Sequence, residues 1–191
     1  MRCRSRDRQV CNHHDHQNSA TNQARDQRVT LRILHILDHS LPQHSGYAFR
    51  TVSILKEQRA RGWETFHLTT PKQGAGEALE ETADDWHFYR TPAVEGAGLL
   101  RQMQLTARRI EELIKVVRPH VLHPHSPVLN ALPAIRVAKR HRIPVVYEMR
   151  ASWEDAAVDH GTTTEGSLRY RVSRQLETYA LKRAHQITTI C

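Results

Sequence analysis

The sequence is poor in cysteine, with three in 191 residues, and two of these, Cys3 and Cys11, lie close to the N-terminus. So few cysteines do not make a disulfide framework, and they suit a reducing compartment. Long apolar runs are lacking as well: no stretch approaches the ~18 residues of a membrane-spanning helix. The N-terminal region also has no apolar core of a secretion signal. We therefore expect a soluble protein of the cytoplasm.

Several common phosphate-binding and catalytic motifs are missing. The loop DHSLPQHSGYAFR (38–50) holds one glycine where a dinucleotide-binding loop has three, and the second expected strand ends in Thr69 and Thr70 rather than in an acidic residue. The chain has no GxxxxGK(S/T) loop and no GxSxG turn. These absences argue against dinucleotide enzymes, P-loop NTPases and typical α/β-hydrolases.

The formal net charge is +8, and six Arg and three Asp within residues 1–28 contribute +3 of it, which leaves +5 for the remainder. A basic excess fits nucleic acid, an anionic membrane surface or phosphorylated substrates, and does not choose among them. Because the arginines near the N-terminus are not interleaved with aromatic residues, we do not expect nucleic acid as a partner.

Residues 1–28 are almost free of apolar residues and show no periodicity. We interpret them as a disordered polar tail, or as vector-derived or mis-started sequence. Cys11, His13, His14 and His16 offer zinc-ligating side chains, but their spacing matches no standard zinc finger. No metal is expected here.

From residue 29 to 191 the pattern alternates between strand and helix. Expected strands cover 31–37, 63–70, 86–90, 120–125, 143–149 and 186–191, with a Gly-rich loop between the second and third. Expected helices cover 47–61, 99–117, 127–141 and 166–184, the last with Leu168, Val172, Leu176 and Tyr179 on one apolar face. This alternation predicts an α/β, Rossmann-like, mostly parallel sheet with helices on both faces.

Such sheets bind ligands outside the carboxyl ends of their strands, which directs attention to the residues after Leu37, Thr70, His125 and Met149. After the first strand, Ser45 is placed to cap a helix that Gly62 would end. Free backbone N–H groups at the helix start favour an anion there, and Gly46 would let a phosphate approach closely. The alternative is that Ser45 only caps the helix and that no anion binds there.

After the fourth strand, HPHSP (123–127) places His123 and His125 two residues apart, so both point the same way if the strand continues. Substrate contacts and structural hydrogen bonding are equally open for them. A metal pair would need further ligands of defined position, and Asp155, Asp159 and His160 supply none that the spacing defines.

After the fifth strand, EMRASWEDAAVDHGTTTEGSLRYR (148–171) is longer and more ionic than a simple connection needs. Glu148, Arg150 and Asp155 belong to a set of ionisable groups too large to bury unpaired. Recognition of a polyol and a phosphate is one interpretation, and internal salt bridges within a long loop are the other. Arg171 and Arg174 share a helix face that meets either a phosphate or water.

The segments LPQHSGYAFRT, RARGWETFHLTTPKQG, VLHPHSP and VVYEMRASWEDAAVDHGTTTEGSLRYR resemble the N-terminal domain of a GT-B glycosyltransferase of family 4. The subgroup associated with exosortase and PEP-CTERM exopolysaccharide systems is the most similar. This resemblance covers residues 29–191. It implies transfer of a sugar from a nucleotide-sugar donor to an acceptor hydroxyl with retention of configuration and without a metal.

The resemblance also implies site residues. The family's glycine-bearing loop, which faces the donor diphosphate, falls on Ser45 and Gly46, and its HxH falls on His123 and His125. Arg150 stands where many members have a sugar-contacting His, and Arg cannot act as a base. The substrate-binding residues that we predict are Ser45, Gly46, Tyr47, His123, His125, Arg150, Trp153, Glu154 and Asp155. No catalytic residue is assigned.

The implied partners are a nucleotide sugar and a glycan or lipid-linked acceptor. A basic helix near Arg169 would allow peripheral contact with the inner face of the cell membrane. We expect the C-terminal, donor-binding domain to be absent from this chain, so that the chain alone has little or no transferase activity. A glycan- or lipid-linked-sugar-binding module without catalysis is the alternative.

Overall fold

The computed structural model describes residues 30–74, 78–152, 155, 161 and 163–190. The chain divides into two compact units, Met1–Thr30 and Leu31–Cys191, and the helices and strands belong to the second. The polar N-terminal region, with its cysteine and histidines, lies outside the described residues. So do Trp153, Glu154, Asp159 and His160.

The described strands form a mostly parallel sheet, as predicted. They are β1 (Arg32–Leu37), β2 (Glu64–Thr69), β3 (Glu80–Ala83), β4 (Trp86–Arg90), β5 (Val121–Pro124), β6 (Val146–Met149) and β7 (Gln186–Thr189). Five of them follow the order β3-β4-β2-β1-β5, and β6 pairs with β7. Isolated bridges from Leu122 to Val145 and from His125 to Glu148 join β5 to β6. Only the β3–β4 pairing is antiparallel among the described strands.

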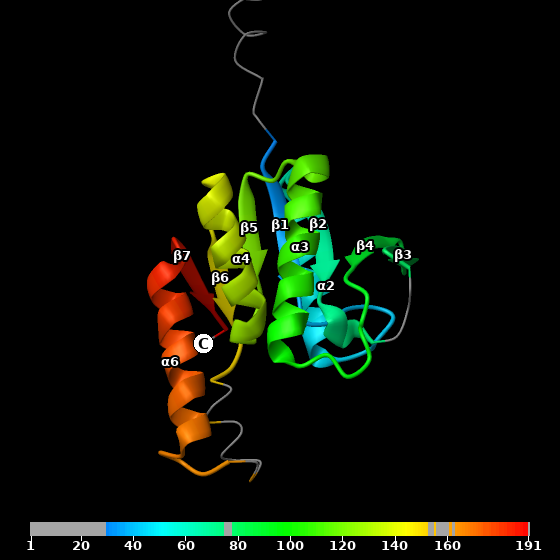
Figure 1. The fold of residues 1–191 in the computed structure, drawn as a ribbon. Helices are drawn as coiled ribbons and strands as arrows, with labels where there is room; N and C mark the ends of the chain where they lie inside the picture. The colour runs from blue at the N-terminus through cyan, green and yellow to red at the C-terminus, as the bar shows by residue number, and fades with distance from the viewer. Residues whose placement is uncertain (1–29, 75–77, 153–154, 156–160, 162, 191) are drawn as a thin grey trace, which may run out of the picture. The chain divides into compact units, whose positions relative to one another are not determined.

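The helices lie on both faces of this sheet. They are α2 (Gly46–Ala60), α3 (Leu99–Val117), α4 (Val128–His141) and α6 (Leu168–Arg183), with a short 3-10 helix η1 at Pro71–Gln73. Figure 1 shows α3, α4 and α6 in front of the strands. Among the described residues, none of these helices is long and apolar enough to cross a bilayer.

The hydrophobic core follows from the alternation of side chains along β1. Leu34 and Ile36 belong to a buried cluster that draws mainly on α3 and α4, whereas Leu37 joins a second cluster with Ala48 and Leu55 of α2. Each face of the central strand is therefore covered by helix, which fixes the strand ends as the place where polar side chains can gather.

The start of α2 is built as the sequence predicts. Ser45 caps the helix, and its Oγ accepts a hydrogen bond from the Ala48 N–H at 3.1 Å. At the other end, Gly62 follows the C-cap with a φ of +79°, a conformation that glycine adopts without steric cost.

One strand of the structure was not predicted from the sequence. The segment between β2 and β4 contains β3, which pairs antiparallel with β4, so the prediction of an uninterrupted loop there was wrong. Asp84 and Asp85 make the turn between them with φ values of 47° and 63°. Asn-Gly and Asp-Gly are the usual signals for such a two-residue turn, and an Asp-Asp pair is a weak one.

The predicted apolar face of α6 was wrong for three of its four residues, since only Leu176 packs against the core. Leu168 is 79% exposed, and Val172 and Tyr179 are 45% and 44% exposed. The helix instead buries Glu177 and Ala180. The small side chain of Ala180 joins the main hydrophobic cluster and Leu176 and Leu181 pack against it, while Leu168, Val172 and Tyr179 are exposed.

Candidate functional site

Three neighbouring strands carry histidines in register. His35 of β1 is aligned with His67 of β2 on one side and with His123 of β5 on the other. His35 also contacts Gln58 of α2, so this row lies on the sheet face that α2 covers. His123 and His125 do point the same way, with ring centroids 4.5 Å apart. The bridge from His125 to β6 then extends the polar row to the strand end at Glu148.

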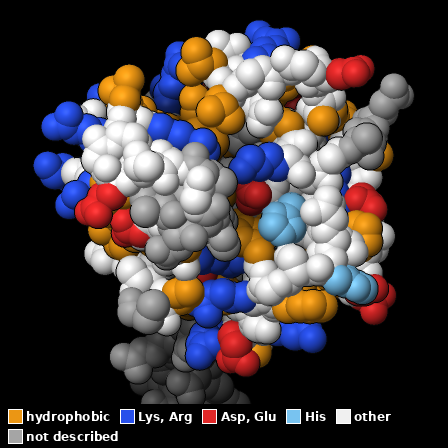
Figure 2. All heavy atoms as spheres, turned by 90° about the horizontal axis from the view of Figure 1, so that it is seen from below, with side chains coloured by type: hydrophobic (Ala, Val, Ile, Leu, Met, Phe, Trp, Pro, Cys, Tyr) orange, Lys and Arg blue, Asp and Glu red, His pale blue; other side chains and the backbone are white. Residues whose placement is uncertain are grey.

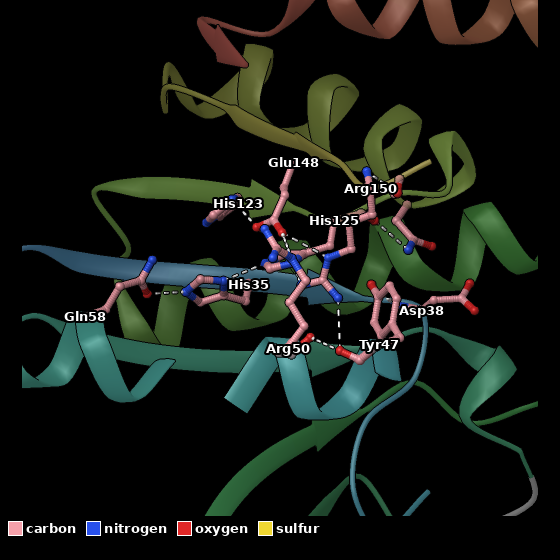
Figure 3. Close-up of polar contacts among 12 residues, drawn as sticks. His35, Asp38, Tyr47, Arg50, Gln58, His123, His125, Glu148 and Arg150 are labelled. Carbon is pink, nitrogen blue, oxygen red and sulfur yellow. Dashed lines mark hydrogen bonds and ion pairs between the residues drawn. The ribbon is translucent and has the colours of Figure 1, made fainter. Parts of the chain in front are cut away.

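Glu148 is the acidic centre of this region, and it is 3% exposed. Its Oε1 accepts a hydrogen bond from Arg150 Nε at 3.0 Å and one from Arg50 Nε at 3.2 Å. Its Oε2 lies 3.4 Å from His125 Nδ1 and 3.5 Å from His123 Nε2. One buried carboxylate thus faces two guanidinium groups and two imidazoles, as Figure 3 shows.

Arg150 lies inside this arrangement rather than on its surface, because it is 8% exposed. Beyond Glu148, its Nη1 donates to the Tyr47 carbonyl oxygen at 3.0 Å and its Nη2 donates to His125 Nδ1 at 2.5 Å. The guanidinium also stacks over the Tyr47 ring, 4.2 Å from the ring centroid. Arg150 therefore ties the end of β6 to β5 and to the first turn of α2.

These contacts determine which nitrogen of each histidine carries its proton. A guanidinium has no acceptor, so His125 must accept at Nδ1 and carry its proton on Nε2. That Nε2–H donates to His35 Nδ1 at 2.9 Å, and the remaining His35 Nε2–H donates to Gln58 Oε1 at 2.8 Å. The result is a directional, buried hydrogen-bond chain from Arg150 through two neutral histidines to Gln58.

Electrostatics keep these histidines neutral. Burial lowers the pKa of His35 and of His125 well below the ordinary value, and nearby histidines and Arg150 add to the decrease. Burial lowers the pKa of His123 to about 4; the Glu148 carboxylate opposes this decrease, and Arg150 adds to it. A row of neutral imidazoles contributes hydrogen bonds but no positive charge at neutral pH.

A metal ion is an alternative partner for three of these histidines. His35, His123 and His125 each offer a nitrogen, and these atoms lie within 4.8 Å of one another. A metal on His125 Nε2 would place the imidazole proton on Nδ1, where it would point at the Arg150 N–H, and the two donors would repel. The donor set therefore suits a hydrogen-bond chain better than a metal centre.

The loop before α2 forms the other wall. Tyr47 OH accepts a hydrogen bond from the Asp38 N–H at 3.0 Å, and Asp38 Oδ1 pairs with Lys72 Nζ at 3.3 Å. Burial raises the pKa of Tyr47, so its hydroxyl stays protonated. Among the described residues, a Cβ added at Gly46 would meet no atom within 4 Å, so the space beside the first backbone groups of α2 is open with respect to them.

Figure 2 looks along the sheet from the carboxyl ends of its strands and shows basic, acidic and histidine side chains meeting near the centre of this face. A separate hollow of about 840 Å³ lies between α4 and α6, lined by apolar and basic side chains that include Ile143 and Arg183. It sits beside Val145, which directly precedes β6, so it belongs to the opposite end of that strand.

Of the predicted site residues, the structure brings Tyr47, His123, His125 and Arg150 together, with Ser45 and Gly46 next to them. Asp155 lies apart and is exposed; its carboxylate accepts hydrogen bonds from Ser152 at 2.6 Å and Tyr170 at 2.9 Å, which lower its pKa. Trp153 and Glu154 are outside the described residues.

Sequence reasoning missed three members of the cluster. His35 and Gln58 complete the hydrogen-bond chain, and Arg50 is the second partner of Glu148. His35 could have been found, because a polar residue in the middle of the apolar run RILHIL stands out. Arg50 lies within the first helix turns after Gly46, but its direction depends on how α2 packs on the sheet.

A mostly parallel α/β sheet flanked by helices is a Rossmann-like fold, and such sheets bind ligands at the carboxyl ends of their strands. The glycosyl transferase 4-like domain family matches residues 45–191, which is most of the chain. The chain therefore belongs to this family. No curated protein matches the sequence significantly.

Solved structures agree on the fold. Sucrose-phosphate synthase from Thermosynechococcus elongatus superposes with a TM-score of 0.61 at 12% identity, over 82% of this chain and 41% of its own. UGT89C1 of Arabidopsis thaliana, solved with UDP, superposes with a TM-score of 0.51 at 13% identity. The match covers 84% of this chain and 42% of UGT89C1. UDP-GlcNAc 2-epimerase from Methanocaldococcus jannaschii superposes with a TM-score of 0.50 at 11% identity. The match covers 82% of this chain and 38% of the epimerase. This chain thus spans about two fifths of the length of each.

Proposed function

We propose that this domain forms the acceptor-side half of a retaining glycosyltransferase that moves a sugar from a nucleotide-sugar donor to an acceptor hydroxyl. Membership of the glycosyl transferase 4-like family supports the reaction class. The observation that carries the proposal is the cluster of Arg50, Arg150 and Glu148 beside the open start of α2, at the carboxyl ends of the strands. A departing nucleoside diphosphate requires positively charged groups that are already held in place.

Within this proposal the donor diphosphate approaches the backbone at Ser45 and Gly46, where the N–H groups and dipole of α2 favour an anion. His123 and His125 line the adjacent wall. Arg150 holds that wall to Tyr47 through its internal hydrogen bonds. We propose that no metal takes part, because the hydrogen bond from Arg150 to His125 disfavours one at the histidines.

A role in exopolysaccharide synthesis, of the kind associated with exosortase and PEP-CTERM systems, is the biological setting that we propose. The acceptor is then a glycan or a lipid-linked sugar, met at the inner face of the cell membrane. Residues 1–191 alone should transfer little sugar, because catalysis in a two-domain cleft needs groups from both walls.

The experiment is a transfer assay on a version of the protein that carries both domains, with UDP-, GDP- and ADP-sugars and glycan or polyprenyl-linked acceptors. Transfer that gives a product of unchanged anomeric configuration supports the proposal. Absence of transfer with every donor contradicts it. Glycan binding by residues 1–191 without any transfer by the longer protein would instead support a non-catalytic binding module.

A further inference from the structure

Two arginines share the carboxylate of Glu148, and their surroundings differ. Arg150 is buried and has acceptors on all three of its nitrogens: Glu148 at Nε, the Tyr47 carbonyl at Nη1 and His125 at Nη2. Arg50 reaches the same Oε1 through Nε alone, and its side chain is 43% exposed. Within the described part of the chain, Glu148 is the one partner of the Arg50 guanidinium.

The local charges do not balance. Arg50 and Arg150 bring two positive charges against one negative charge on Glu148. His35 and His125 are neutral, because the chain from Arg150 to Gln58 assigns each of them a single proton, and burial lowers the pKa of His123 to about 4. The neighbouring pair of Lys72 and Asp38 is balanced within itself. One positive charge is left over among these groups, and Arg50 is where it meets solvent.

The position of Arg50 on α2 also favours an anion. Arg50 lies on α2, one turn beyond Gly46, and a Cβ added at Gly46 would meet no atom within 4 Å in the part of the chain that the structure describes. The first turn of α2 contains no acidic residue. An anion beside the start of α2 therefore lies near the guanidinium of a side chain that is 43% exposed and contacts Glu148 through Nε, and phosphate accepts two parallel hydrogen bonds from such a group.

We propose that Arg50 is the side chain that binds a phosphate group of the ligand, and that Arg150 is a positioning residue that holds Glu148, His125 and the start of α2 in place. This rests on the proposed function and deepens it, since it names a phosphate-binding residue for the site. It also reverses the sequence-based expectation, in which Arg150 contacts the ligand.

The test is calorimetric titration of residues 1–191 with inorganic pyrophosphate and, separately, with UDP. We expect Arg50→Gln to weaken both about tenfold or more, the size of a lost charge-assisted hydrogen bond. Arg50→Lys, which keeps the charge, should lose less than Arg50→Gln. Because Arg50 is half exposed, the melting temperature without ligand should change little in both variants.

Arg61→Gln is the matched control. Arg61 is the C-cap residue of the same helix and also pairs with a glutamate, Glu57, but it lies about 16 Å along the helix axis from Arg50. This variant should bind pyrophosphate like the parent protein. Absence of pyrophosphate binding by the parent protein, or equal affinities for Arg50→Gln and Arg61→Gln, would overturn the inference.

The failures of the two proposals are distinguishable. If the longer, two-domain protein transfers no sugar while Arg50→Gln still abolishes pyrophosphate binding, the proposed function fails and the anion site stands. If transfer occurs and Arg50→Gln changes neither KM nor kcat, the phosphate role of Arg50 fails and the proposed function stands.

Discussion

The interior of the parallel sheet and its β7 edge are built differently. Around β1, β5 and β6, polar side chains are buried and bonded to one another, with His35, His125 and Glu148 almost fully covered. Around β7 and the outer side of α6, apolar side chains such as Leu168 and Ile187 are exposed instead. The comparison shows that the ionic groups at the strand ends are nearly as enclosed as the apolar core, whereas large apolar side chains of α6 and β7 are exposed.

This difference in burial has a consequence for stability. A buried ionic cluster is sensitive to the loss of a member that is itself buried, such as Glu148 or Arg150, because the remaining charges keep their desolvation cost. A half-exposed helix held by few buried side chains is tolerant of surface changes and opens more readily. The predictions below test this contrast in order of decreasing effect.

Glu148→Ala should have the largest effect, with a loss of about 3–5 kcal/mol in the free energy of unfolding, because it leaves the buried Arg150 charge uncompensated. Urea denaturation measures it. Glu57→Ala is the matched control: it removes the exposed partner of Arg61 and should cost about 0.5 kcal/mol or less. Similar losses in both variants would show that burial does not set the energetics of Glu148.

Acid should destabilise the fold through its buried histidines. The pKa of His123 is about 4 in the folded protein against 6.5 for an ordinary histidine, so the unfolded chain binds a proton first as pH falls. Stability from this residue is complete above about pH 6.5 and is lost progressively down to about pH 4, for a total of about 3 kcal/mol. His35 and His125 act in the same direction.

Chemical denaturation at a series of pH values between 7 and 4 checks this dependence. A His123→Gln variant should show a shallower decline than the parent protein over the same range. A stability that is flat from pH 7 to pH 5 would contradict the buried, neutral histidines.

Tyr147→Phe should have an intermediate effect. Tyr147 OH donates to Glu177 Oε1 at 2.8 Å, and both side chains are buried between β6 and α6. Removing the hydroxyl should cost about 1–3 kcal/mol, because the buried carboxylate loses a donor. Tyr179→Phe on the same helix removes an exposed hydroxyl that Arg183 contacts and should cost much less. Equal losses would contradict this assignment of the α6 contact.

Leu168→Ala should have the smallest effect, within about 0.5 kcal/mol, because the side chain is 79% exposed. The same change at Leu34, which is fully buried in β1, should cost about 2–5 kcal/mol. Thermal unfolding of the two variants gives the comparison. A large loss at Leu168 would mean that its side chain is covered in solution.

The sequence predicted the fold well because its signals are local. The strand-helix alternation and the Ser45 cap are encoded by neighbouring residues, and α3 begins and ends at the predicted Leu99 and Val117. The direction of α6 was not predictable in the same way, since it depends on which side of the helix meets α4. Periodicity identified an apolar stripe, but Ala180 rather than Leu168 faces the core.

The candidate site was predictable only in part. His123 and His125 were found because strand geometry alone places them on one side. The ionic partners of Glu148 were not, since Arg50 lies 98 positions away in the sequence and reaches it through tertiary packing. For Arg150 the position was found, but the role of a buried brace follows only from its contacts with Tyr47 and His125.

The most direct test of the account is hydrogen exchange of residues 1–191, measured by mass spectrometry with and without a saturating concentration of UDP. The account predicts slower exchange in peptides that contain Gly46 to Arg50, His123 to Ser126 and Glu148 to Arg150, with little change along α4 and α6. Protection confined to the hollow between α4 and α6, with the strand ends unaffected, would contradict a ligand site at the carboxyl ends of the strands.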